Sequence, residues 1–210
     1  MTNMSKVRCQ AAKDNTPYLQ LSFSNIRGLR SNLDEVSHFL QARSPDVFAV
    51  SETKLDSSVA SSDLTPAGYT LHRLDRAPCH GLALYAKTSL PLRRLLESED
   101  SRHEYLAFIA PLRSRTVLMF FVYRSPSSDS EVFDVLSTKI DSLLQKYPAA
   151  EVTVFGDLNV HNQEWLIHSR STDTSGLAAQ TLTQIVTSPT RVPDRDGDLD
   201  ISLICSSPPC

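Results

Sequence analysis

The sequence predicts an α/β fold, in which central β-sheets are covered by helices. Three observations predict it: strand-like runs recur along the chain, amphipathic helical segments interrupt them, and several strands end in polar residues. The 210 residues are enough for one sizeable domain with its own core. A hydrophobic content of 40% and a charged content of 21% are ordinary for a globular protein.

The first part of the fold is predicted to alternate strand and helix. Residues 18–25 alternate apolar and polar side chains, as a half-buried strand does, and residues 45–52 form a short apolar run. Between them, residues 31–43 predict a helix with Ser31 or Asn32 as its N-cap. The apolar side chains of this helix share one face: Leu33, Val36, Phe39 and Leu40. The order strand, helix, strand indicates a crossover unit.

The middle of the chain is richer in strands. Five successive runs have strand character: 68–74, 81–87, 90–96, 104–110 and 116–124. Residues 129–147 then predict an amphipathic helix that leads into an apolar, β-branched strand at 150–155. The predicted apolar stripe of that helix consists of Val132, Val135, Leu136, Ile140, Leu143 and Leu144.

The last part of the chain is predicted to contain a helix over residues 174–186 and a strand over residues 199–205, joined by a loop. No GxGxxG motif follows the first strand, which excludes a dinucleotide-binding fold. Residues 1–17 are polar and are expected to form a flexible leader, so the predicted domain spans residues 18–210.

The composition favours an intracellular protein that is not bound to a membrane. No apolar run approaches the ~20 residues needed to cross a bilayer, and the N-terminus lacks the apolar core of a secretory signal. The four cysteines form no CxxC pair, which argues against a disulfide framework. The net charge of −3 does not by itself indicate a nucleic-acid partner, and the sequence indicates no oligomeric state.

Polar residues end three of the predicted strands. Asn25 ends the first of them, Glu52 ends the second, and Asp157 and Asn159 lie at the end of the third. Each of them alone is more often a turn former or a solvated strand end. Their shared position favours a ligand site, because ligands of α/β sheets gather at such strand ends. Carboxylates and carboxamides suit Mg²⁺ and a phosphate group.

Two further strand ends carry functional side chains. Tyr123 leaves its predicted strand beside Arg124, where a phenol can donate a hydrogen bond to a phosphate oxygen. The alternative interpretation of Tyr123 is a tyrosine of the core or its rim. Asp200 opens the last predicted strand, where a carboxylate needs a partner.

Six segments in order resemble the endonuclease/exonuclease/phosphatase superfamily, which includes DNase I-like nucleases and apurinic/apyrimidinic endonucleases. They are "FSNIRGLRSN", "VSETKL", "GLALYAK", "VYRSP", "FGDLNVHNQEWL" and "PTRVPDRDGDLDISLI". The likeness is greatest to endonuclease domains encoded by non-LTR retrotransposons upstream of their reverse transcriptase. It implies a four-layer α/β sandwich of the DNase I type. The partners that it implies are DNA and a reverse-transcriptase domain, and it implies a nuclear location if the target is chromosomal DNA.

The resemblance also implies roles for individual residues. Glu52 matches the metal-binding glutamate, and Asn25 the asparagine beside that metal, with Mg²⁺ as the expected ion and Mn²⁺ as the alternative. The residues that match catalytic positions are Tyr123, which contacts the scissile phosphate, Asp157, which activates water, Asn159, its partner on the phosphate, and Asp200, which braces a histidine. Arg124 and Asn162 are the residues expected to bind substrate.

The chain ends ten residues after Asp200, before the place where the superfamily has its Ser-Asp-His stretch. His38, His72, His80 and His103 lie in the wrong context to replace the histidine. We therefore expect a C-terminally truncated domain with weak catalysis. Two functions compete: a Mg²⁺-dependent endonuclease that nicks target DNA, and a catalytically inactive remnant that binds nucleic acid weakly. The same scaffold also serves inositol-phosphate and sphingomyelin phosphodiesterases.

Overall fold

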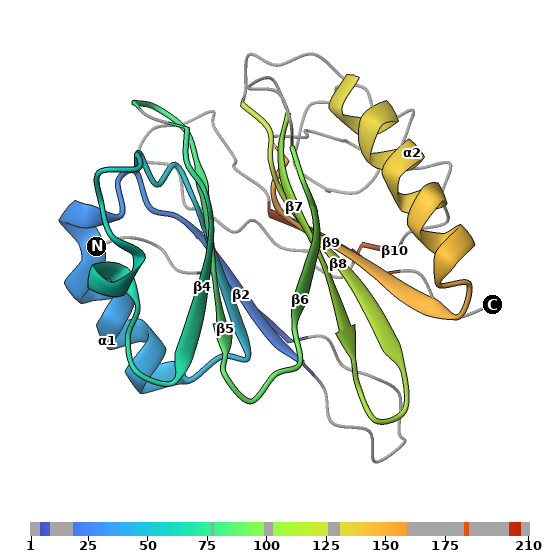
Figure 1. Ribbon diagram of the computed structural model, residues 1–210, viewed down its shortest axis with the longest axis horizontal. Coiled ribbons are helices and arrows are strands. Elements are labelled where there is room, and N and C mark those ends of the chain that lie inside the picture. Colours follow the sequence, from blue (N-terminus) through green and yellow to red (C-terminus); the bar gives the residue numbers. More distant parts are fainter. Residues whose placement is uncertain are drawn as a thin grey trace. The chain divides into compact units, whose positions relative to one another are not determined.

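The structure, a computed structural model, describes residues 5–8, 19–76, 78–98, 103–125, 131–158, 183–184 and 202–206. The chain divides into two compact units, Met1–Leu92 and Arg93–Cys210. Within the described residues, each unit is built on one mixed sheet with a helix on one of its faces (Figure 1). The predicted α/β class is confirmed.

Unit 1 contains a described sheet of five strands in the order β1-β2-β3-β5-β4. Their bounds are Ser5–Arg8, Gln20–Asn25, Val47–Ser51, Leu82–Lys87 and Tyr69–Leu74 in that order. β2 and β3 are parallel, and the helix α1, Leu33–Arg43, connects them. This is the predicted crossover. Short 3-10 turns precede α1 at Arg30–Asn32 and precede β4 at Ser61–Leu64.

The carboxylate of Asp46 fixes the register of three strands at the edge where β3 begins. Its Oδ2 accepts a hydrogen bond from the Gln20 backbone N–H at 2.9 Å, and its Oδ1 lies 3.0 Å from Lys87 Nζ. The backbone N–H of Asp46 in turn donates to the Gln20 carbonyl at 3.0 Å. Register matters here because a slip of one residue would turn every side chain of a strand to the other face.

The helix α1 packs its apolar stripe against one face of this sheet. Val36 and Leu40 are fully buried, and Leu33 and Phe39 are partly buried, as the periodicity predicts. They contact a cluster that contains Phe48, Val50, Ala83 and Tyr85. The alternate residues of β3 are buried as well, so both faces of this strand are removed from water.

Two details of unit 1 differ from the sequence prediction. Ser5–Arg8 lies in the expected leader, yet it forms β1 and pairs antiparallel with β2. The sequence did not predict β1, because a strand of four residues is defined by its hydrogen bonds to β2 and is too short to show a periodic pattern. Asn32 is the N-cap of α1 by position, but its side chain does not cap the helix. Instead its Nδ2 donates to the carbonyls of Ile26 and Gly28 at 3.0 and 2.8 Å.

Unit 2 contains a described sheet of six strands in the order β10-β11-β9-β8-β7-β6. Their bounds are Thr183–Gln184, Ser202–Ser206, Ala150–Asp157, Thr116–Tyr123, Glu104–Pro111 and Arg93–Glu97 in that order. β8 and β9 are parallel, and the helix α2, Glu131–Lys146, connects them. The predicted strand over 199–205 is confirmed within β11. The predicted helix over 174–186 is wrong at Thr183–Gln184, and its other residues lie outside the described part.

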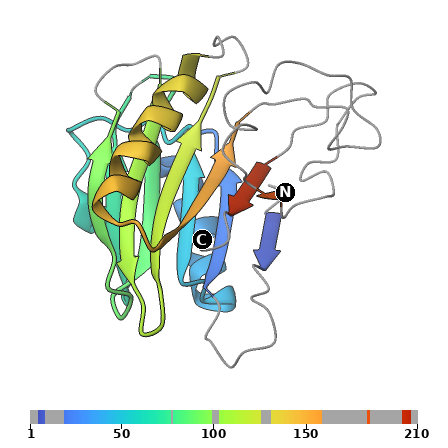
Figure 2. The ribbon, with the colours of Figure 1, turned by 90° about the vertical axis from the view of Figure 1, so that its right-hand side faces the viewer.

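The helix α2 lies across β7, β8 and β9 (Figure 2). Val132, Leu136, Ile140 and Leu143 are buried, and Val135 and Leu144 are partly buried, in agreement with the predicted stripe. Phe133, which the stripe omits, is buried too. The strand residues beneath α2 alternate along each strand: Tyr105, Ala107 and Ile109 in β7, Leu118, Phe120 and Val122 in β8, and Val152 and Val154 in β9. Neither α1 nor α2 combines the length and the hydropathy that a membrane-spanning helix needs.

Tyr85 provides a test of the unit 1 core. Its ring is fully buried, its hydroxyl donates to the Leu64 carbonyl at 3.1 Å, and burial raises its pKa well above the usual 10.0. The unfolded chain loses this proton near pH 10 and the folded chain only at higher pH. The unfolding free energy should therefore fall by about 1.4 kcal/mol per pH unit above pH 10.

We expect Tyr85→Phe to remove this pH-dependent loss and to cost ~1–3 kcal/mol below pH 10, because a buried carbonyl loses its donor. Urea unfolding between pH 8 and 11 measures both effects. Tyr69→Phe is the comparison variant, since the Tyr69 hydroxyl donates to the Pro45 carbonyl at 2.9 Å and partial burial raises the pKa of Tyr69 as well. It should flatten the pH dependence less than Tyr85→Phe does, because Tyr85 is the more deeply buried of the two. Identical pH slopes for wild type and Tyr85→Phe would contradict this expectation.

Candidate active site

The predicted site residues of unit 1 lie at the carboxyl ends of β2 and β3. Asn25 and Ser51 are register partners in the parallel pair, so Glu52 emerges directly beside Asn25. Asn25 Nδ2 donates to Glu52 Oε1 at 2.7 Å, while Asn25 Oδ1 accepts from the Arg27 backbone N–H at 3.3 Å. The structure thus brings these two predicted residues together, and Asn25 orients the Glu52 carboxylate.

Glu52 is held in a left-handed backbone conformation, with φ +55°. Such a conformation costs of order 1–3 kcal/mol in a non-glycine residue and persists only when neighbours impose it. The neighbouring segments impose it through three backbone hydrogen bonds. Leu29 donates to the Thr53 carbonyl at 2.9 Å, and the N–H groups of Thr53 and Lys54 donate to the carbonyls of Gly81 and His80 at 3.1 and 2.9 Å.

Arg73 of β4 fastens the segment that follows Glu52. Its guanidinium donates to the carbonyls of Val59 and Asp56 at 2.7 and 2.9 Å and forms a 2.6 Å ion pair with Asp75. Sequence reasoning missed this residue, because its partners lie 14 and 17 positions away and no local pattern marks them. Arg73 therefore limits the movement of the backbone after Glu52.

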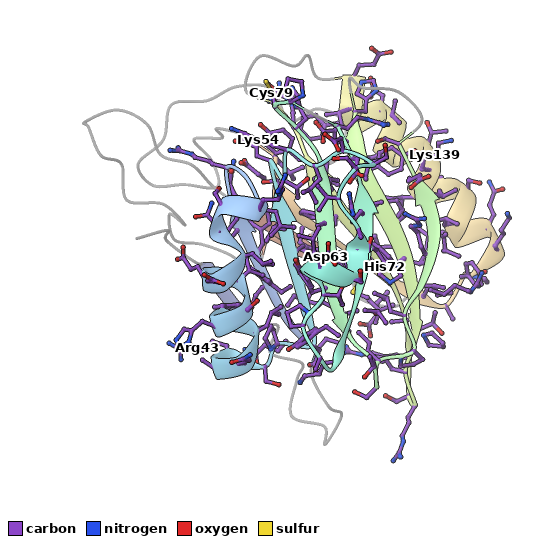
Figure 3. All side chains as sticks on the ribbon, turned by 60° about the vertical axis from the view of Figure 1, so that its left-hand side comes forward. Arg43, Lys54, Asp63, His72, Cys79 and Lys139 are labelled. Carbon is purple, nitrogen blue, oxygen red and sulfur yellow. The ribbon has the colours of Figure 1, made fainter. Side chains whose placement is uncertain are left out.

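Exposed cations lie on the segments that follow β2 and β3. Arg27, Arg30 and Lys54 are exposed on the two loops that carry Asn25 and Glu52. Figure 3 shows Lys54 near the same end of unit 1 as Cys79, with Arg43 at the opposite end. The pKa of Asp56 is lowered by hydrogen bonds from the hydroxyl and N–H of Ser58, and further by the Arg30 and Arg73 cations. This end of the sheet presents positive charge beside one partly buried carboxylate.

The predicted site residues of unit 2 that the structure describes lie at the carboxyl ends of β8 and β9. Tyr123 and Asp157 are register partners in the parallel pair, and both are buried, with 5% and 4% exposure. Val122 and Val154 belong to the α2 face. Because successive side chains of a strand alternate, Tyr123 and Asp157 lie on the opposite face. The Arg124 backbone N–H donates to the Asp157 carbonyl at 2.8 Å and extends the pairing past the strand end.

Gly156 allows β9 to approach β8 just before Asp157. Its φ is +136°, and a Cβ there would lie 1.9 Å from the Val122 carbonyl oxygen. No other residue fits this position without a shift of the backbone. The Gly-Asp sequence at the end of an apolar run was the one local signal of this arrangement.

The other predicted residues are placed differently or are outside the description. The guanidinium carbon of Arg124 lies 5.7 Å from the centre of the Phe133 ring, so this cation turns toward α2 and away from the face of Tyr123 and Asp157. Its role in substrate binding stays a prediction. Asn159, Asn162 and Asp200 lie outside the described residues, and their roles also stay predictions. So does the convergence of Asn25, Glu52, Tyr123, Asp157 and Asn159 on one cleft.

The oxygen donors of Glu52 and Asn25 fit Mg²⁺. Among the described residues, no group of three or more His, Cys, Asp or Glu could hold a metal ion. Mg²⁺ does not require such a group, because it is usually bound by one or two carboxylates, with waters and substrate phosphate oxygens completing its shell. Glu52 supplies a carboxylate whose orientation is already fixed by Asn25.

Comparison with known proteins rests on structure. The sequence matches no protein-family model and no curated protein. Three of the solved structures that share the fold illustrate the likeness. The 3′ phosphatase NExo from Neisseria, bound to product DNA hairpin, has 16% identity and a TM-score of 0.63 over 90% of this chain and 86% of that chain. A mannosyl-6-phosphatase from Bacteroides thetaiotaomicron has 13% identity and a TM-score of 0.64, with coverages of 90% and 85%.

The third is the AP endonuclease of Leishmania major, with 21% identity and a TM-score of 0.55 over 76% of this chain and 61% of that chain. The fold is DNase I-like. This agrees with the fold class that the sequence predicts. At these identities the likeness establishes the fold alone.

Gly81 tests how Glu52 is positioned. A Cβ at Gly81 would lie 2.5 Å from Thr53 Oγ1 and 3.1 Å from the Leu74 carbonyl, at φ +105°. We expect Gly81→Ala to cost ~2–4 kcal/mol, because a clash adds to backbone strain. Gly68→Ala is the control, with φ +87° and no atom within 4 Å, and should cost only ~1–2 kcal/mol. Equal losses in urea unfolding would show that Gly81 does not brace Thr53.

Proposed function

We propose that this chain is a Mg²⁺-dependent phosphodiester hydrolase that nicks DNA. One observation carries the proposal: both parallel strand pairs end in side chains suited to phosphoryl chemistry. These are the hydrogen-bonded Asn25 and Glu52 in unit 1 and the buried Tyr123 and Asp157 in unit 2. The hydrolysis needs a cation-binding group, for which Glu52 is the candidate, and a water-activating group, for which Asp157 is the candidate.

The chemistry follows from the residue types. Bound Mg²⁺ would neutralise charge that develops on the phosphate oxygens. Glu52 would hold the cation, and Asn25 keeps the Glu52 carboxylate in place. Asp157 would accept a proton from the attacking water, whose oxygen forms a bond to phosphorus. Tyr123 would donate a hydrogen bond to a phosphate oxygen. The bond from phosphorus to O3′ breaks, and a proton from solvent water converts the departing O3′ to a hydroxyl, which leaves a 3′-hydroxyl and a 5′-phosphate.

The choice of DNA as substrate rests on two supports, because the fold also serves a mannosyl-6-phosphatase. Arg27, Arg30 and Lys54 form an exposed basic group beside Glu52, which suits the phosphate backbone of a polyanion. The sequence segments resemble retrotransposon endonucleases. Under this proposal the 3′-hydroxyl primes a reverse transcriptase encoded downstream, and the nick is made in the nucleus.

The test is nicking of supercoiled plasmid in Mg²⁺. One nick per molecule converts the plasmid to the relaxed form, so even a slow enzyme is detected. Asp157→Asn should lower the nicking rate ~10²–10⁴-fold, because it removes the proton acceptor. Glu52→Gln should lower it comparably at low Mg²⁺ and recover in part at high Mg²⁺, because it weakens cation binding.

The control is Glu151→Gln, at the other end of β9, where Glu151 pairs with Arg115 at 2.8 Å. It should nick at the wild-type rate. A wild-type chain that binds plasmid without relaxing it, with or without Mg²⁺, would overturn the proposal and favour an inactive remnant. Equal nicking by wild type and Asp157→Asn would remove Asp157 from the mechanism.

A further inference from the structure

Glu104 is a buried carboxylate that the mechanism above does not use. It opens β7 and is 2% exposed. Across the antiparallel pair its register partner is Tyr123, and the partner of Tyr123 across the parallel pair is Asp157. β7, β8 and β9 lie side by side (Figure 1). Glu104, Tyr123 and Asp157 therefore form one row across three strands.

All three side chains of this row lie on the same face of the sheet. Tyr105, Val122 and Val154, their neighbours or near neighbours along the strands, contribute to the core beneath α2. Alternation then places Glu104 on the opposite face together with Tyr123 and Asp157. All three are at least 95% buried, so water screens their interactions poorly.

Register fixes how near Glu104 and Tyr123 are. Directly opposed residues of an antiparallel pair have Cβ atoms ~4.5–5.5 Å apart, and adjacent strands are separated by ~4.8 Å. At this separation the carboxylate of a glutamate is within reach of the ring of an opposed tyrosine. The edge of an aromatic ring carries partial positive charge, and the phenol hydroxyl is a donor. Both features attract a carboxylate, whereas a buried carboxylate without favourable neighbours is costly.

We propose that Glu104 is a positioning residue that orients the phenol of Tyr123. The functional part of this inference rests on the proposed function, in which Tyr123 donates to a phosphate oxygen. Glu104 is the register partner of Tyr123 on one neighbouring strand and Asp157 is its partner on the other, so a carboxylate residue lies beside Tyr123 on each side. Glu104 acts on the reaction through Tyr123 and itself touches no substrate.

The direct test observes Tyr123 without requiring activity. The chain is labelled with ¹³Cζ-tyrosine, and the Tyr123 resonance is assigned from its loss in Tyr123→Phe. Glu104→Gln keeps the size of the side chain and removes its charge, and it should shift the Tyr123 resonance selectively. Glu151→Gln, a partly buried carboxylate of the same sheet, should leave the Tyr123 resonance in place. An unshifted Tyr123 resonance in Glu104→Gln overturns the inference.

The kinetic test asks whether the effect passes through Tyr123. Glu104→Gln should lower kcat for plasmid nicking about 10- to 100-fold with little change in KM, because a misplaced group loses transition-state contacts. In a Tyr123→Phe background the same substitution should cause no further loss. Equal losses in both backgrounds would indicate a general structural role and overturn the inference.

Two outcomes separate this inference from the proposed function. If the wild-type chain does not nick DNA, the proposed function fails, and the Tyr123 resonance alone decides whether Glu104 orients the phenol. If Glu104→Gln does not fold, Glu104→Asp takes its place, since it keeps the charge and withdraws it by one methylene. Glu104→Asp should then shift the Tyr123 resonance, and an unchanged resonance counts against the inference.

Discussion

Parallel pairing of β2 with β3 and of β8 with β9 is the constraint on which the candidate site depends. Parallel strands bring their carboxyl ends to the same sheet edge, and the register then decides which side chains become neighbours. In unit 1 the register pairs Asn25 with Ser51 and so delivers Glu52 beside Asn25. In unit 2 it pairs Tyr123 with Asp157. Shifting either register by one residue would turn the apolar set of that strand away from its core.

The backbone around Glu52 and Asp157 is held in place by residues that have no proposed role in the reaction. Glu52 keeps its left-handed conformation because the segments on both sides of it donate and accept backbone hydrogen bonds, and Arg73 ties down the residues that follow. Asp157 follows a glycine that lets β9 approach the Val122 carbonyl. In unit 1 the strain at Glu52 is balanced by a buried sheet that cannot easily rearrange, whereas in unit 2 the glycine adopts its positive φ without strain.

Elements with strong periodicity were predictable from the sequence, and pairings between distant segments were not. The faces of α1 and α2 follow from the spacing of Val36 and Leu40 and of Leu136, Ile140 and Leu143. β1 was missed because four residues carry too little pattern, and Thr183–Gln184 was assigned to a helix although pairing with β11 makes it a strand. Of the residues proposed for the site, Glu104 was missed because its significance lies in register and burial.

Glu52, after β3, and Asp157, at the end of β9, lie in different electrostatic environments. This difference fits the different roles proposed for them, cation binding and proton acceptance. Glu52 is only partly buried and has exposed cations near it, so an incoming ion or phosphate can reach it from solvent. Asp157 and Glu104 are almost entirely buried on the same face of one sheet, with the phenol of Tyr123 between them. Interactions of side chains buried in this row are screened weakly by water. A phenol is a neutral hydrogen-bond donor, so it can serve either a protein carboxylate or a phosphate oxygen. Tyr123 is therefore constrained twice: it must pack in the buried row of unit 2, and under the proposed function it must also donate to a phosphate oxygen.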